Sequence, residues 1–294
     1  MYVKEGSYKS YSEVAISSII YGSIGIFLNN IRDMSIESIL FSLSFFGFCM
    51  IFIYLLFRRG LEQLKFRKNR RYLILLGLLN TITGICYFSS IKYSGLSVSV
   101  LLLYTAPVYV SLLAPIILGE RNSRKSLLPL FLAVTGVLLI ARPGEVLMSV
   151  ATGSNFQKGL IFGLLAGLSF GTTIVMVRYL RHDYTEITQT FWITVISLLV
   201  MLPSALFTPL HLFIENLNIL IMFGFTITFA AIIYVRGISG IDAQTGSILA
   251  LLEPVSGIFF DVTFLKNPLY ISTLLGCCLI ITAAYIVSRK DWGN

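Results

Sequence analysis

Charged residues are scarce in this chain, and their scarcity decides which solvent the fold must suit. Only 12% of the 294 residues are Asp, Glu, Lys or Arg, whereas 56% are hydrophobic. The mean hydropathy is +0.85, and a soluble domain carries about 25% charged residues. No hydrophilic stretch is long enough to enclose a core of its own. The composition therefore excludes a separate soluble domain and indicates a protein embedded in lipid.

Histidine and cysteine are also sparse, which removes several kinds of chemistry. We expect the two histidines, His182 and His211, in loops on opposite sides of the membrane, which disfavours a histidine metal site or a catalytic triad. The four cysteines fall within apolar segments, where they act as small apolar residues rather than as a disulfide framework. No glycine-rich loop ends in Lys-Ser or Lys-Thr, so ATP use is not expected. We predict neither a cofactor nor a metal.

Apolar segments of about 17–25 residues recur along the whole chain, and this is the length that a helix needs to cross a bilayer. The first of them resembles a signal peptide, but Asn29, Asn30 and Arg32 follow it in place of a small-residue cleavage site, so we expect a retained span. The segments predict ten membrane spans, with ends placed to within ~2–4 residues. They run over 13–30, 36–57, 72–91, 96–118, 126–141, 159–178, 188–207, 214–235, 243–265 and 269–288.

The lysines and arginines indicate which side of the membrane each loop faces. With a cytoplasmic N-terminus, 17 of the 22 fall on the cytoplasmic side and five on the other. Such an imbalance is what the positive-inside rule requires, and a missed span would scramble it. The basic run Lys65–Arg71 is then a topology signal that touches anionic lipid rather than nucleic acid. We predict a multi-pass plasma-membrane protein with both termini in the cytoplasm.

The second half of the sequence repeats the first. A shift of 147 residues places Pro107-Val108 on Pro254-Val255, and a shift of 149 places Tyr21-Gly22-Ser23 on Phe170-Gly171-Thr172. Each unit holds five spans, an odd number, so the second unit enters the membrane from the opposite side.

The repeat predicts an all-α integral membrane protein of ten transmembrane helices, built as two inverted five-helix repeats over residues 1–147 and 148–294. Inverted repeats can exchange conformations between inward-open and outward-open states, which is the basis of alternating access. A duplication that only enlarges the bundle is the alternative.

Short motifs add a resemblance that covers nearly the whole chain. Tyr21-Gly22 in the first span, Gly119-Glu120 at the end of the fourth, and Leu251–Pro254 in the ninth resemble the EamA branch of the drug/metabolite transporter superfamily. The resemblance implies a secondary transporter of a small metabolite, such as an amino acid or a related amphipathic compound, with export as its direction. Asn267 stands where that family usually has a second glutamate equivalent to Glu120, which removes a symmetric role for the pair.

Glu253 is the sharpest polar feature of the predicted spans. An acidic residue near mid-span costs about 2.5–3.5 kcal/mol on insertion scales, so it faces a cavity, has a partner or stays protonated. Glu253 can contact a substrate amine, couple transport to protons, or act only as a hydrogen-bonded packing residue.

Two prolines mark the other candidate feature. Pro107 and Pro254 each kink a helix and free the carbonyl four residues earlier, at Leu103 and Ala250. Free carbonyls at membrane depth are tolerated only where protein or water satisfies them. Helix interruptions at matching places in two halves therefore indicate a transport site, with a plain packing kink as the alternative.

Aromatic and polar residues at similar depth complete the candidate binding set. Aromatic walls with a few polar anchors suit amphipathic metabolites, although helix packing explains any single one of them. These candidates are Asn80, Tyr87, Tyr104, Trp192, Tyr234 and Gln244.

Two other functional classes compete with transport. An intramembrane enzyme acting on lipid or peptide would need paired acidic residues or a nucleophile with a base, and Glu253 has no evident acidic partner. A receptor or assembly subunit would need no cavity residues. We predict a transporter rather than an enzyme, with a small-molecule substrate and the lipid bilayer as partners.

Overall fold

The computed structural model describes residues 4–120, 127–141 and 156–289, and these residues form helices and short connections without a strand. The first half contains α1 (Lys4–Gly22), α2 (Ile24–Asn30), α3 (Ile36–Phe57), the 3-10 helix η1 (Leu61–Leu64), α4 (Arg70–Ser94), α5 (Leu96–Leu103), α6 (Ala106–Leu118) and α7 (Leu127–Ile140). The second half contains α9 (Phe156–Tyr179), η3 (Leu180–His182), α10 (Glu186–Phe207), α11 (Leu210–Glu215), α12 (Leu217–Gly240), α13 (Ala243–Ala250), α14 (Leu252–Phe264) and α15 (Ile271–Arg289).

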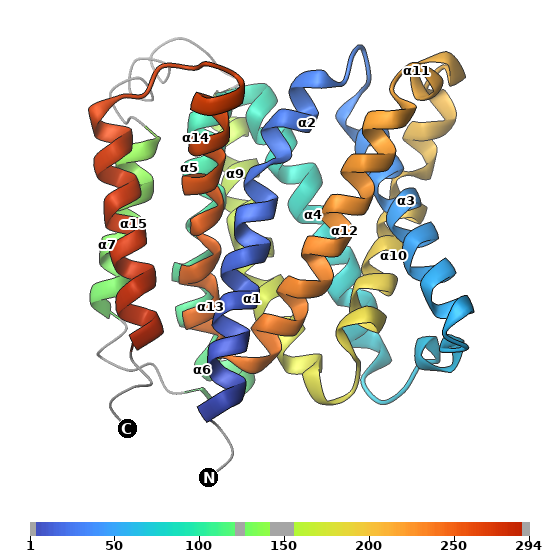
Figure 1. Cartoon of the computed structure of the whole chain (residues 1–294), viewed down its shortest axis with the longest axis horizontal. Coiled ribbons are helices and arrows are strands. Elements are labelled where there is room, and N and C mark those ends of the chain that lie inside the picture. The colour runs from blue at the N-terminus through green and yellow to red at the C-terminus, as the bar shows by residue number, and fades with distance from the viewer. Residues whose placement is uncertain (1–3, 121–126, 142–155, 290–294) are drawn as a thin grey trace.

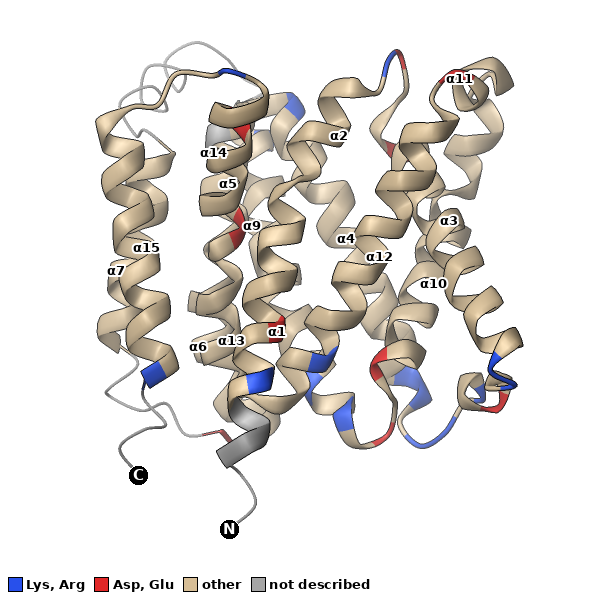
Figure 2. Cartoon of the chain, viewed as in Figure 1, with Lys and Arg blue, Asp and Glu red and all other residues tan. Residues whose placement is uncertain are grey.

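The helices form one bundle in which α1 begins and α15 ends at the same end (Figure 1). Within the described ranges, nine helical stretches are long and apolar enough to cross a membrane, and α7 is a shorter apolar helix of 14 residues. These ten elements coincide with the ten predicted spans. The prediction of an all-α integral membrane protein is therefore confirmed. Lysines and arginines of the described chain gather toward the ends of the bundle and leave its middle almost free of positive charge (Figure 2).

Two spans are interrupted at equivalent places. The fourth span changes from α5 to α6 at Tyr104–Thr105, and the ninth changes from α13 to α14 at Leu251. Pro107 and Pro254 lie in the first turn of α6 and of α14, where a residue without a backbone N–H can start a new helix but cannot continue the previous one.

The packing between the two halves occurs in matched pairs. The contact of α4 with α9 has its counterpart in α12 with α1, and that of α6 with α9 has its counterpart in α14 with α1. In the pairs α3–α10 and α7–α15, each helix packs against its own equivalent in the other half. This is the pattern that two inverted repeats of five spans produce. The predicted boundary between residues 147 and 148 lies outside the described residues.

Equivalent glycines allow the first span of each half to lie close to the interrupted span of the other half. Gly22 of α1 faces Ser256 and Gly257 of α14, and Gly171 of α9 faces α6. A Cβ added at Gly171 would lie 2.9 Å from the carbonyl oxygen of Ala106 and 3.0 Å from the Cβ of Tyr109. Helices in lipid associate through such small-residue contacts, because lipid gives no hydrophobic drive for helix association.

The packing predicts that Gly171→Ala lowers the melting temperature of the purified protein in detergent by roughly 2–10 °C, since overpacking costs about 1–3 kcal/mol. Gly84→Ala is the matched control, because its new Cβ would meet only the Cδ1 atom of Leu40 at 3.4 Å. Equal melting temperatures for the two variants would contradict the close approach of α9 and α6.

Candidate functional site

A cavity of about 300 Å³ lies among the helices of both halves. It is bordered by α1, α2, α3, α4, α5, α9, α10, α12, α13 and α14, and the surface that lines it is mostly apolar. Leu103 and Ala250, whose carbonyls Pro107 and Pro254 leave without an intrahelical partner, both line the cavity. The two helix interruptions therefore meet at one place, where the freed carbonyls do not face lipid.

Glu253 of α14 is the one charged residue among the described residues that line the cavity. The hydroxyl of Tyr104, at the interruption between α5 and α6, forms a hydrogen bond with the Glu253 carboxyl group. Tyr21 of α1, Tyr87 of α4 and Tyr234 of α12 also interact electrostatically with Glu253. The carboxyl group thus lies in an aromatic environment that four different spans supply.

Tyr21 and Tyr234 both line the cavity and form an edge-to-face pair. Their ring centroids are 6.2 Å apart and their planes meet at 79°. The hydroxyl of Tyr234 is buried and has no hydrogen-bond partner among the described residues. It is therefore free to bond with a guest in the cavity, since buried polar groups are normally paired.

Most of the hydroxyl groups around the cavity are already used within the protein. Thr83 donates to Leu79 O at 2.9 Å, and Thr81 donates to Gly77 O at 2.8 Å while also pairing with Ser197. In α9, Thr173 donates to Ser169 O, and in α10 Thr194 donates to Phe191 O. Such bonds to a neighbouring turn are the usual fate of Ser and Thr inside a helix. They reduce the number of hydroxyl groups that can donate to a ligand.

The structure brings most of the predicted site residues to this cavity. Asn80, Tyr234 and Glu253 line it. Tyr104 is hydrogen-bonded to Glu253, and Tyr87 interacts electrostatically with both of them.

Trp192 and Gln244 lie apart from the cavity lining. The indole N–H of Trp192 donates to Leu64 O at 3.1 Å, and its ring stacks on Phe66 with centroids 4.3 Å apart, so it fastens the connection between α3 and α4. Gln244 is buried at the second position of α13, with 7% of its surface exposed. Trp192 lies in the second turn of α10 and Gln244 in the first turn of α13, so both residues are near the ends of their spans.

Tyr21 and the hydroxyl-bearing lining residues of α10 are not among the residues that the sequence predicts for the site. Thr190, Thr194 and Ser197 of α10 line the cavity, and the hydroxyl of Thr190 is buried without a partner in the described structure. Their spacing of four and three residues places them on one helix face, and this was the signal available in the sequence. Tyr21 precedes Gly22, and the close approach of Gly22 to α14 brings Tyr21 near Glu253.

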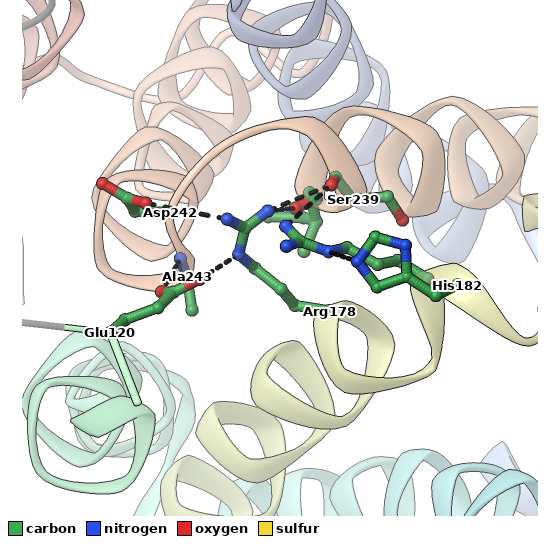
Figure 3. Close-up of polar contacts among 8 residues, drawn as sticks. Glu120, Arg178, His182, Ser239, Asp242 and Ala243 are labelled. Carbon is green, nitrogen blue, oxygen red and sulfur yellow. Dashed lines mark hydrogen bonds and ion pairs between the residues drawn. The ribbon is translucent and has the colours of Figure 1, made fainter. Parts of the chain in front are cut away.

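A second polar cluster surrounds Arg178 at the end of α9 (Figure 3). The Arg178 side chain is 9% exposed and makes an ion pair with Glu120, which follows α6. The other Glu120 oxygen accepts the backbone N–H of Ala243, the first residue of α13, at 2.9 Å. Arg178 also donates to Ser239 O at 3.0 Å and lies 3.6 Å from the carboxylate of Asp242. One arginine thus joins the ends of α6, α9 and α12 to the start of α13.

This cluster lies directly beyond one end of the cavity. Val177 and Val235 line the cavity, and the residue after each of them is an arginine. Arg178 belongs to the cluster just described, and Nε of Arg236 pairs with Glu13 Oε1 at 2.8 Å. These ion pairs therefore lie between the last lining residues of α9 and α12 and the bundle end where α1 begins.

The sequence profile described as the EamA-like transporter family matches the chain twice, over residues 10–142 and 157–289. An "uncharacterized transporter" of Archaeoglobus fulgidus is 27% identical over 285 residues, covering 95% of this chain and 97% of that protein. The pseudopaline exporter CntI of Pseudomonas aeruginosa is 25% identical over 248 residues, covering 83% of each chain. A solved crystal structure shares the fold with a TM-score of 0.79 at 15% identity, covering 97% of this chain and 98% of that one.

The burial of the Arg178–Glu120 ion pair predicts that it stabilises the protein much more than the exposed Lys65–Glu62 pair does. Arg178→Ala leaves Glu120 partly buried without its cation, and breaking a buried pair in this way costs about 3–5 kcal/mol. We expect a clear fall in the melting temperature of the purified protein.

The exposed pair of Lys65 and Glu62 is the control. Lys65 lowers the pKa of Glu62 through a hydrogen bond and its charge, yet both side chains lie in solvent. Exposed pairs add little to stability, so Lys65→Ala should leave the melting temperature unchanged. A variant at Arg178 as stable as the one at Lys65 would contradict the structural role of the cluster.

Proposed function

This chain belongs to the EamA-like transporter family, and we propose that it is a secondary transporter that moves a small amphipathic metabolite through the central cavity by alternating access. The observation that carries the proposal is the meeting of two interrupted spans at a cavity that also contains Glu253. Interrupted helices at matching places in two repeats are where secondary transporters bind their substrates. The family and the names of the relatives place the chain among transporters rather than enzymes.

We further propose that transport runs outward. The relative from Pseudomonas aeruginosa is named an exporter, and it matches this chain over most of its length. The excess of lysine and arginine on the side of the N-terminus supports a cytoplasmic location for both termini. With that orientation, the Arg178 cluster lies at the cytoplasmic end of the cavity.

In this proposal the Arg178 cluster is the closed cytoplasmic gate. Opening toward the cytoplasm would require Glu120 to release both Arg178 and the backbone N–H of Ala243. The repeat places Asn267 at the position equivalent to Glu120 and Asn29 at the position equivalent to Arg178, so these equivalent positions cannot form an ion pair. The two gates of this transporter therefore differ in chemistry, although the repeats have the same fold.

Glu253 is the residue on which coupling or recognition depends in this scheme. A carboxyl group inside the membrane is costly to charge, so it is used where it exchanges a proton or meets a cationic group of the substrate. Tyr104 orients it, while Pro107 and Pro254 hold the interruptions that open the cavity beside it.

The orientation predicts opposite labelling at two loops. In a variant without the four native cysteines, Arg32→Cys lies in the connection between α2 and α3, and Lys68→Cys lies in the connection between α3 and α4. We expect a membrane-impermeant maleimide to label the cysteine at position 32 in intact cells and the cysteine at position 68 only after permeabilisation. The reverse pattern would overturn the orientation.

Transport itself is tested in proteoliposomes with a panel of labelled amino acids, sugars and cations. We expect Glu253→Gln to reduce uptake of the accepted substrate at least ~10-fold, because the change removes the one charge of the described cavity lining. If substrate exchange across the membrane survives while pH-driven accumulation is lost, Glu253 couples transport to protons. If exchange is lost at every pH, Glu253 binds the substrate.

Trp192→Phe serves as the matched control, because Trp192 lies away from the cavity lining and phenylalanine keeps an aromatic ring against Phe66. Its uptake should equal that of the wild type. Unchanged uptake and unchanged pH dependence in the Glu253 variant would remove Glu253 from the mechanism.

A further inference from the structure

We propose that the cargo of the central cavity is an organic monocation, that is, an ammonium group on a small apolar body without a carboxylate of its own. The inference rests on the proposed transport function and specifies its substrate class. Its grounds are the sign of charge in the cavity, the arrangement of its aromatic rings and its small, largely apolar interior.

The charge of the cavity has one sign. Glu253 is the one residue of the types Asp, Glu, Lys, Arg and His among the described lining residues. The arginines nearest along the chain to the lining, Arg178 and Arg236, are already paired with Glu120 and Glu13. A cationic guest would therefore meet its counterion at Glu253, whereas an anionic guest would be buried beside a carboxyl group without a cation. Burying an unpaired charge is strongly unfavourable.

The aromatic rings favour the same kind of guest. Tyr21 and Tyr234 line the cavity at 79° to each other, so their rings form two sides of a corner near Glu253. The faces of aromatic rings attract ammonium groups, and cages of such rings recognise alkylated amines. The unpartnered hydroxyl of Tyr234 can in addition accept an N–H from a primary or secondary amine.

The size of the cavity and its largely apolar surface suit a small guest with an apolar body. The hydroxyl groups of Thr81, Thr83, Thr173 and Thr194 already donate to carbonyls of their own helices. The buried hydroxyl groups of Thr190 and Tyr234 have no partner among the described residues, so the lining can bond with a few polar groups of a guest. The volume of about 300 Å³ is at the lower end of small-molecule sites, which suits a small apolar body.

Three probes of nearly equal size test the inference. 2-Phenylethylamine carries only an ammonium group, phenylalanine adds a carboxylate, and 3-phenylpropanoate has a carboxylate and no amine. Binding is measured by calorimetry on the purified chain in nanodiscs, and uptake of each labelled probe is measured in proteoliposomes. We expect the amine to bind at least ~10-fold more tightly than phenylalanine, and the anion to show no binding.

Variants then separate the contributions of charge and ring. Glu253→Gln should weaken binding of 2-phenylethylamine at least ~10-fold, and Tyr21→Leu should weaken it ~3–5-fold because the cation–π contact is lost. Glu215→Gln, an exposed residue at the end of α11, is the matched control and should bind like the wild type. Gel filtration and melting temperature verify that each variant is folded.

The outcomes distinguish this inference from the proposed function. Phenylalanine or 3-phenylpropanoate binding as tightly as the amine, or an unaltered amine affinity in folded Glu253→Gln, would overturn the cationic class. If a neutral or anionic compound is transported, transport stands and the cationic class is wrong. If the amine binds through Glu253 but is never moved across the membrane, the cationic site stands and the transport proposal is wrong.

Discussion

Lipid offers no hydrogen-bond partner, and the arrangement of this protein depends on that constraint. Every backbone group within the bilayer must find its partner inside the protein. Pro107 and Pro254 violate the helical pattern in the fourth and ninth spans, and the carbonyls they free at Leu103 and Ala250 cannot face lipid. Both residues line the central cavity. The two prolines, 147 residues apart, thus place both helix interruptions at the cavity.

The scaffold is nearly symmetric, but the chemistry it carries is not. Helix pairs, interruptions and glycine contacts occur twice with the halves exchanged. A shift of 147 residues places Ala106 at the position equivalent to Glu253, so only the second half supplies a carboxyl group there. Likewise, the shift places Asn267 opposite Glu120 of the Arg178 cluster. Inverted repeats thus provide two interconvertible shapes, while unequal residues at equivalent positions can give the two sides different functions.

The sequence was sufficient to predict the spans, the repeat and the interruptions, because each depends on a signal that is local along the chain. Long apolar runs mark spans, and proline marks a broken helix. The sequence was less informative about which residues meet. The depth of a side chain in the membrane and the direction in which it points depend on how the helices pack. Trp192, predicted at the cavity, therefore donates instead to Leu64 O in the connection between α3 and α4. Tyr21 was overlooked as a cavity residue because its approach to Glu253 depends on the contact of Gly22 with α14.

The charges of the Arg178 cluster are also suited to a contact that opens in the proposed transport cycle. Burying Arg178 removes water from its guanidinium group, and the ion pair with Glu120 together with carbonyl groups of α12 offsets that loss. When such a contact opens to an aqueous compartment, water hydrates both charged groups again. The open state therefore regains much of the hydration free energy that the closed state lacks. An apolar contact has no such compensation, because opening it exposes hydrocarbon to water. A layer of ion pairs at this end can therefore keep two states close in energy, and small differences in substrate binding then suffice to shift the population between them.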